Sequence, residues 1–171
     1  MNTAILTVVL TGALLAGQNG TVTWQNDYSK AQEEGAAQKK PLVVVFGYGA
    51  NGWVKVIREA PTPDLTKLLA DKYVCVYVDT ASPAGRKLAE DFGITGNLGL
   101  VISDQVGTSQ AFWHQGDLAN KTMFHYLEKY GDPGVPIRAT ETVNTVRTSY
   151  YPPDASQGNA PAIGSMRSRS C

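Results

Sequence analysis

A glycine-rich segment is the first part of the sequence whose spacing is compatible with chemistry. Gly47, Gly49 and Gly52 form the pattern G-x-G-x-x-G directly after the apolar run 42–46. In dinucleotide-binding proteins such glycines let a pyrophosphate approach the amino end of a helix, and an acidic residue after the next strand binds the ribose. Asp79 ends the next predicted strand, so a dinucleotide site is one hypothesis.

Three observations count against a dinucleotide site. Asp79 follows Gly52 by 27 residues, whereas about 20 are expected. Pro61 and Pro63 interrupt the segment that should form one crossover helix. The structured sequence after Asp79 is too short for a second mononucleotide-binding half. We therefore keep dinucleotide binding as an alternative.

The two cysteines define a second kind of chemistry. Cys75 lies in the strand-forming run 73–79, and Cys171 is the last residue. A cysteine buried in a strand carries little thiolate and reacts slowly. A terminal cysteine is free to pair with another chain in an oxidising compartment. Residual thiol oxidoreductase chemistry at either cysteine is therefore a further alternative.

Metal, cofactor and nucleic-acid binding find no support. His114 and His125 stand apart, without the spacing of metal ligands, and no cofactor is predicted. The chain has 15 Lys+Arg and 15 Asp+Glu, so it lacks the basic excess typical of nucleic-acid-binding proteins.

Helical and strand patterns alternate along the chain. Helices are predicted within 24–40 and over 53–59, 65–72, 82–92 and 118–130, where 53–59 is the start of a helix that Pro61 and Pro63 interrupt. Strands are predicted over 42–46, 73–79, 98–103 and 108–114. Asp27 or Ser29, Asp64 and Ser82 are the predicted N-caps. Alternation of this kind predicts an α/β fold with a parallel core, to which the last two strands add an antiparallel hairpin.

The two ends of the chain differ from this pattern. Residues 3–16 carry no charge and are too few to span a bilayer. We interpret 1–17 as a signal peptide, with a buried first strand or helix as the alternative. The protein is then expected to be exported, periplasmic or secreted, without stable membrane insertion after cleavage. Residues 134–171 are rich in Pro, Gly, Ser, Thr and Asn, which predicts a disordered C-terminal tail.

Several short strings resemble the thioredoxin-like fold family over residues 24–133. These strings are Trp24, Tyr28 and Ala31 ahead of Lys40–Phe46, then Val78–Asp79, Phe92–Gly96 and Gly107. The resemblance implies a three-layer sandwich. Its central mixed β-sheet, a parallel core plus an antiparallel hairpin, would be flanked by helices.

The family's catalytic features are missing. Counted from Phe46, the four positions of its Cys-x-x-Cys motif fall on Asn51, Gly52, Trp53 and Val54. Disulfide exchange needs one thiolate to attack and a second thiol to resolve the mixed disulfide, and these side chains supply neither. The resemblance therefore implies a redox-inactive protein, which we interpret as an exported peptide- or protein-binding module or a structural module.

Two further family positions are also replaced. The buried acid that assists proton transfer falls on Val45, and the cis-proline falls on Leu98. A cis bond before a residue other than proline costs about 2.5–4 kcal/mol, so we predict a trans bond at Leu98.

We call residues 48–54 the altered turn, and this segment has two interpretations. It could be a helix-capping turn, with Asn51 at the N-cap and Trp53 packed on the core. It could instead be a retained binding surface for an unidentified protein or peptide. The candidate groove then consists of Tyr48, Asn51, Trp53, Asn97 and Leu98.

Overall fold

The computed structural model describes residues 21–49, 51–143 and 146–147. In chain order the elements are β1 (Trp24–Gln25), α1 (Tyr28–Gln38), β2 (Leu42–Gly47), the 3-10 helix η1 (Gly52–Val56), α2 (Pro63–Lys72), β3 (Val74–Asp79), α3 (Pro83–Asp91), β4 (Gly99–Ser103), β5 (Gln110–Gln115), α4 (Asn120–Tyr130), β6 (Thr140–Glu141) and β7 (Val146–Arg147). None of the helices in these ranges combines the length and apolarity needed to cross a bilayer.

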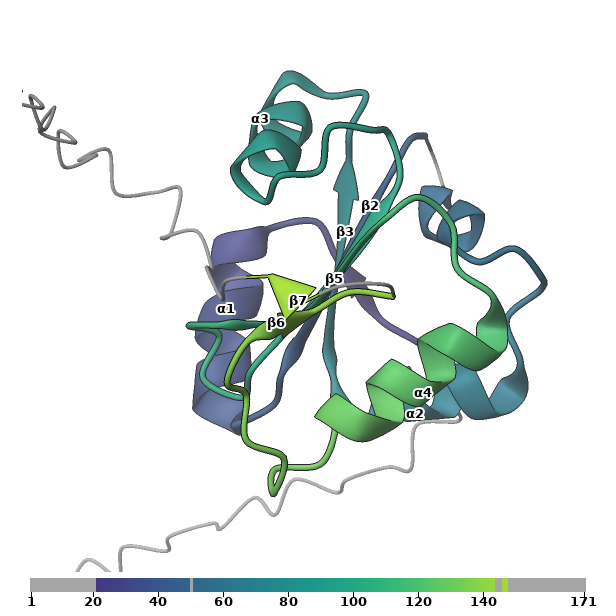
Figure 1. Cartoon of the computed structure of the whole chain (residues 1–171). Coiled ribbons are helices and arrows are strands. Elements are labelled where there is room, and N and C mark those ends of the chain that lie inside the picture. The colour runs from purple at the N-terminus through teal and green to yellow at the C-terminus, as the bar shows by residue number, and fades with distance from the viewer. Residues whose placement is uncertain (1–20, 50, 144–145, 148–171) are drawn as a thin grey trace, which may run out of the picture.

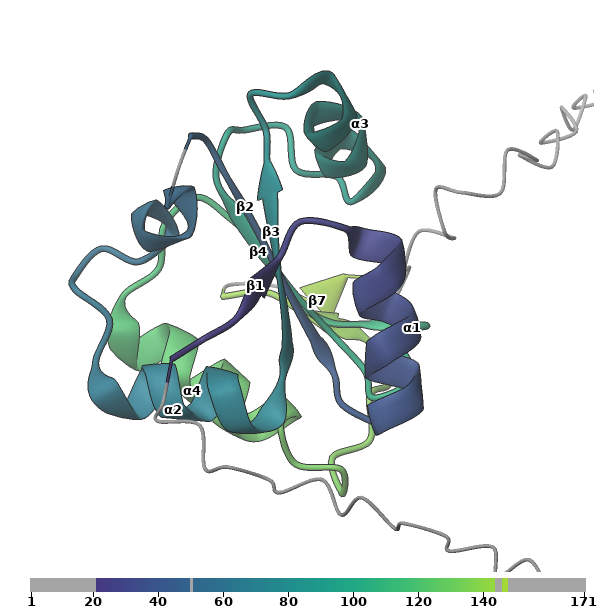
Figure 2. The ribbon, with the colours of Figure 1, turned by 180° about the vertical axis from the view of Figure 1, so that it is seen from behind.

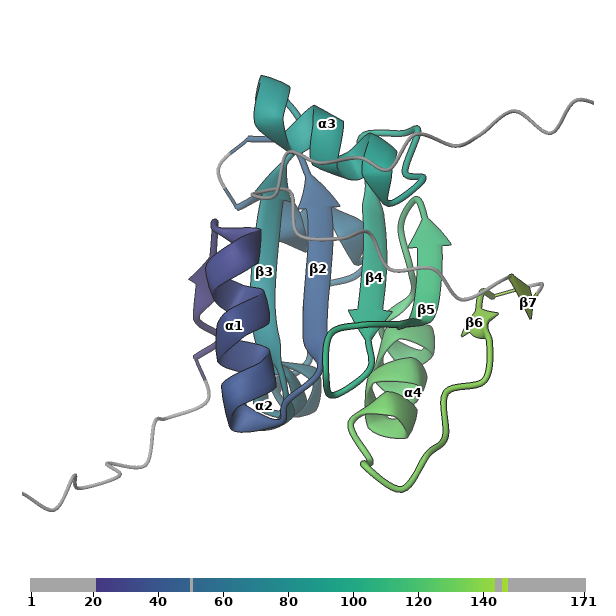
Figure 3. The ribbon, with the colours of Figure 1, turned by 90° about the vertical axis from the view of Figure 1, so that its left-hand side faces the viewer.

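One mixed sheet forms the centre of the fold (Figure 3). Its strand order is β1-β3-β2-β4-β5-β6-β7. β2 and β3 are parallel, whereas β4 runs antiparallel to β2 and to β5. The predicted parallel core with an antiparallel hairpin is therefore confirmed.

Helices cover both faces of the sheet. α1 and α3 lie on one face, and α2 and α4 lie on the other (Figures 1 and 3). Side chains of β2 alternate between two cores: Val44 and Phe46 pack in the cluster that contains residues of α1 and α3, and Val43 and Val45 pack with residues of α2 and α4. This burial on both faces explains why β2 is apolar throughout.

Local capping residues set the starts of the helices. The side chain of Asp27 accepts a hydrogen bond from the Lys30 N–H at 3.1 Å, as predicted for α1. Ser82 Oγ accepts from the Gly85 N–H at 3.0 Å and caps α3. The predicted cap at Asp64 is wrong. Thr62 Oγ1 accepts from the Leu65 N–H at 3.3 Å instead, because Pro63 occupies the first helical position, where its missing N–H costs nothing.

This corrected cap predicts a difference between two substitutions. Thr62→Ala removes the acceptor of the Leu65 N–H and should lower the free energy of unfolding by about 1 kcal/mol. Asp64→Asn removes only a first-turn charge and should cost about 0.3 kcal/mol. Urea denaturation of both variants measures the difference, and a larger loss for Asp64→Asn would contradict the assignment.

The predicted disordered tail, residues 134–171, is wrong in its first part. Thr140–Glu141 forms β6, which pairs in parallel with β5. Thr140 Oγ1 donates to the Gln110 carbonyl at 3.0 Å, and Lys129 Nζ contacts Glu141 Oε1 at 2.7 Å. β5 and α4 supply these polar partners, and Val135 and Ile137 of the same segment pack against the core. Contacts with distant residues therefore order this part of the tail. The predicted signal peptide at 1–17 and the end of the tail, residues 148–171, lie outside the described residues.

Candidate functional site

The altered turn follows β2, at the end of the sheet where β4 begins. Gly49 and Asn51 have left-handed backbone conformations, with φ of 74° and 56°. η1 then spans only Gly52–Val56, so the helix predicted over 53–59 is shorter than expected. It ends because Ile57 becomes extended and forms a parallel bridge with Leu118.

Close packing accounts for the last glycine of the G-x-G-x-x-G pattern. A Cβ atom at Gly52 would overlap the Tyr77 hydroxyl oxygen. This hydroxyl donates to the Gly49 carbonyl at 2.6 Å. Gly52 is therefore required so that β3 can contact the turn, whether or not a ligand is present.

Three backbone amides of the turn already have partners. The Gly49 N–H donates to Asp79 Oδ1 at 3.2 Å. The Gly52 N–H donates to the Gly49 carbonyl at 3.1 Å, and the Val54 N–H donates to the Asn51 carbonyl at 3.2 Å. A pyrophosphate would have to displace these bonds, one of which is accepted by Asp79 Oδ1. This geometry counts against dinucleotide binding.

The capping interpretation of the altered turn can be compared with the contacts of Trp53 and Asn51. Trp53 packs against the core cluster of α2 and α4, and its ring stacks on Trp24 with centroids 5.0 Å apart. Asn51 occupies the N-cap position of η1, but its side chain makes no capping hydrogen bond. The capping interpretation therefore describes Trp53 and fails for Asn51.

Two apolar side chains of the turn region remain exposed to solvent. Tyr48 is 44% exposed and Val54 is 38% exposed. Lys55 Nζ lies 3.7 Å from the centre of the Tyr48 ring and donates to the Tyr48 carbonyl at 3.2 Å. Lys55 thus orients the ring of Tyr48.

The segment before β4 lies at the same end of the sheet as the altered turn. Phe46 at the end of β2 pairs with Gly99 at the start of β4, which brings Asn97 and Leu98 near the turn. The Asn97 carbonyl accepts from Thr80 Oγ1 at 3.2 Å, and the Leu98 side chain packs partly buried on the core. The described residues contain no cis peptide bond, so the predicted trans bond at Leu98 is confirmed.

The hollow at this end of the sheet differs from the predicted groove. Asn51 and Trp53 line a hollow of about 720 Å³, which extends along the end of β3 and the start of α3. Tyr48, Asn97 and Leu98 do not line it. The sequence placed the candidate groove on the β4 side of the turn, whereas the hollow opens on the β3 side.

The thiol alternative loses most of its support at Cys75. This side chain is 3% exposed, and its Sγ lies 3.8 Å from the Leu69 carbonyl. Burial raises the pKa of the Cys75 thiol to about 12. Thiol chemistry depends on the thiolate, so Cys75 is poorly suited to it. Cys171 lies outside the described residues.

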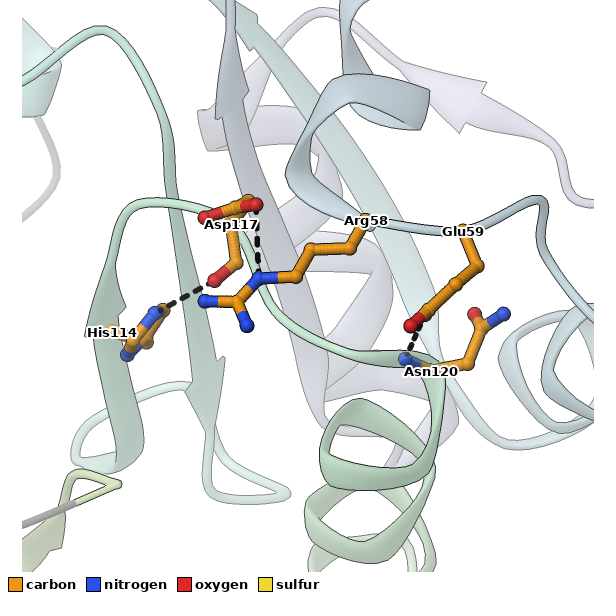
Figure 4. Close-up of polar contacts among 5 residues, drawn as sticks. All are labelled: Arg58, Glu59, His114, Asp117 and Asn120. Carbon is orange, nitrogen blue, oxygen red and sulfur yellow. Dashed lines mark hydrogen bonds and ion pairs between the residues drawn. The ribbon is translucent and has the colours of Figure 1, made fainter.

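A polar cluster that the sequence did not indicate lies between the segment after η1 and the start of α4 (Figure 4). Arg58 Nε contacts Asp117 Oδ2 at 3.0 Å, and His114 Nε2 lies 3.2 Å from the Asp117 carbonyl. Glu59 Oε2 accepts the Asn120 N–H at 2.9 Å. These residues come from segments about 60 positions apart, and no local pattern joins them. Their contacts fix the segment after η1 against the start of α4.

His114 predicts a dependence of stability on pH. Burial lowers the pKa of His114, although Asp117 opposes this shift. A lowered pKa in the folded state means that stability is complete above the ordinary value of about 6.5 and falls as the pH drops below it. Urea denaturation between pH 7 and pH 5 should show this loss, and His114→Gln should show a smaller one. An identical pH profile for the two proteins would contradict the prediction.

The strand order, the mixed sheet and the two helical layers define a thioredoxin-like fold. A thioredoxin from Thermus thermophilus superposes with a TM-score of 0.51 at 18% identity, over 63% of this chain and 85% of the thioredoxin. A structure described as DsbH oxidoreductase gives a TM-score of 0.48 at 16% identity, over 73% of this chain and 95% of that protein. No protein-family model and no curated protein sequence matches the chain. At this identity the likeness establishes the fold alone.

Proposed function

We propose that the chain is an exported, redox-inactive thioredoxin-like protein whose altered turn binds a protein or peptide. One observation carries the proposal. The turn at the positions that correspond to the Cys-x-x-Cys motif has no thiol, yet its Gly49 backbone is bonded to Tyr77 and Asp79, and it presents the exposed side chains of Tyr48 and Val54. Exposed apolar side chains on an ordered loop are typical of contact surfaces.

The chemistry of the turn supports a macromolecular partner. Tyr48 combines a large apolar ring with a hydroxyl, a residue type enriched in protein interfaces. The balanced charge of the chain, 15 Lys+Arg against 15 Asp+Glu, gives no support to a nucleic-acid partner. Export rests on the uncharged apolar segment 3–16.

Site-specific photo-crosslinking tests the proposal in the native host. A photoreactive phenylalanine analogue replaces Val54 in one variant and Val106 in another. Val106 is 61% exposed, and it lies in the β4–β5 connection at the opposite end of the sheet (Figure 3). We expect a discrete protein adduct from position 54 and none from position 106.

Two outcomes would contradict the proposed surface. One is no adduct from either position. The other is the same adducts in the same yield from both, which would indicate nonspecific contact. Tyr48→Ser combined with the label at position 54 is the matched control, and it should reduce the yield of the adduct.

A further inference from the structure

The hollow on the β3 side of the turn is a second candidate binding feature. Its volume is about 720 Å³, within the range of about 300–1,000 Å³ that is usual for small-ligand sites. It lies where β1, the turn, the end of β3 and the start of α3 converge. Figure 2 shows β1 crossing in front of β3, with α3 beyond the end of β3.

The charged lining of this hollow is of one sign. Asp79 is an acidic residue of the wall, and among the residues that the structure describes no Lys, Arg or His lines it. Asp79 Oδ1 accepts the Gly49 N–H at 3.2 Å and the Ala81 N–H at 3.0 Å. These bonds fix the carboxylate in place. Asp79 Oδ2 has no hydrogen bond or ion pair with the described residues, so it remains available to a ligand.

Aromatic rings form another part of the wall. Trp24 and Trp53 stack with an interplanar angle of 28°, and Tyr77 lies nearby with its hydroxyl bonded to the turn. The faces of aromatic rings attract cations, and this attraction strengthens when the cation leaves water. Rings that are already held in place lose little freedom when a ligand binds.

Two side-chain amides complete the polar part of the hollow. Asn26 and Asn51 line it, and within the described chain neither side chain makes a hydrogen bond. Their carbonyl oxygens can accept hydrogen bonds from N–H donors. Burial raises the pKa of the Tyr77 hydroxyl, and the nearby negative charge of Asp79 raises this pKa further.

We propose that this hollow binds an organic ammonium group, with Asp79 as its counter-ion and the rings of Trp24, Trp53 and Tyr77 as its apolar contacts. The ammonium group can belong to a small amine or to a lysine side chain of a peptide, since both present the same charge. The proposal stands independently of the protein partner proposed for Tyr48 and Val54, because small probes are enough to test it.

Matched pairs of probes separate charge from shape. Choline is compared with its uncharged isostere 3,3-dimethyl-1-butanol. A blocked Gly-Lys-Gly peptide is compared with the same peptide that carries norleucine. Each is titrated into the full-length protein while tryptophan fluorescence and heat are recorded. We expect saturable binding of at least one ammonium probe, at least tenfold tighter than that of its uncharged partner.

Two variants place the binding in this hollow. Asp79→Asn keeps the oxygen that accepts the Gly49 and Ala81 amides and removes the charge, so the fold should persist while ammonium affinity falls at least tenfold. Asp91→Asn, at the end of α3 and outside the hollow, should bind as the unchanged protein does. Tighter binding of choline than of the lysine peptide would indicate a small amine as the natural ligand, and the reverse order would indicate a peptide.

Three results would overturn the proposal. They are equal affinity for the charged and uncharged probes, absence of saturable binding by both ammonium probes, and unchanged affinity in Asp79→Asn. Circular dichroism and urea denaturation of Asp79→Asn establish that a loss of affinity does not come from unfolding.

Discussion

Gly85→Ala should lower the free energy of unfolding by about 1–3 kcal/mol in total. Gly85 lies in the first turn of α3, where a Cβ atom would overlap the Asp79 carbonyl oxygen and lie 2.9 Å from Ser82 Oγ. Alanine normally favours a helix over glycine by about 1 kcal/mol. The overlap with backbone opposes this gain and costs about 1–3 kcal/mol, and the displaced Ser82 cap adds about 1 kcal/mol.

Gly96→Ala is the matched control for this prediction. Its added Cβ would lie 3.3 Å from Gln115 Nε2, at the end of a flexible side chain. We expect a change of less than about 1 kcal/mol, since surface substitutions usually have small effects. Urea denaturation measures both variants. If Gly85→Ala proved as stable as the parent protein, α3 could not lie as close to the end of β3 as described.

Cys75 should be nearly inert toward thiol reagents in the folded protein. The variant Cys171→Ser leaves Cys75 as the single thiol. Burial raises the pKa of Cys75 from 9.0 to about 12, which reduces the thiolate fraction at pH 8 by roughly a thousandfold, and restricted access slows the reaction further. We therefore expect labelling with an aromatic disulfide reagent to be at least about 100-fold slower in the folded chain than in urea.

The same pKa shift sets the direction of an alkaline effect. A pKa raised on folding means that the stabilisation is complete below pH 9 and is lost as the pH rises toward 12. Cys75→Ser in the same background is the control, because it removes this titration. Rapid labelling of Cys75 in the folded chain at neutral pH would revive the thiol alternative.

Features set by neighbouring residues were predictable from the sequence. The continuous apolar run of β2 indicated burial on both faces, and Asp27 and Ser82 cap the helices that they precede. The error at Asp64 was also local. Pro63 prefers the first helical position, so the residue before it, Thr62, was the better choice for the cap.

Features set by distant residues were not predictable. β6 is ordered by contacts of Thr140 and Glu141 with Gln110 and Lys129. The amino-acid composition of the tail does not indicate such contacts. For the site, counting along the sequence from Phe46 predicted a candidate surface at the altered turn. It did not reveal that Tyr77 and Asp79 bond to this turn, nor that the hollow opens on the β3 side, because four separate segments form its wall.

Insulin reduction in the presence of dithiothreitol tests the central claim most directly. We expect the rate with the full-length chain to equal the rate with dithiothreitol alone at every protein concentration, because the turn after β2 contains no cysteine and Cys75 is buried. An active thioredoxin in the same assay is the positive control. A rate that rises in proportion to the concentration of this protein, and that disappears in Cys75→Ser or Cys171→Ser, would contradict a redox-inactive thioredoxin-like protein.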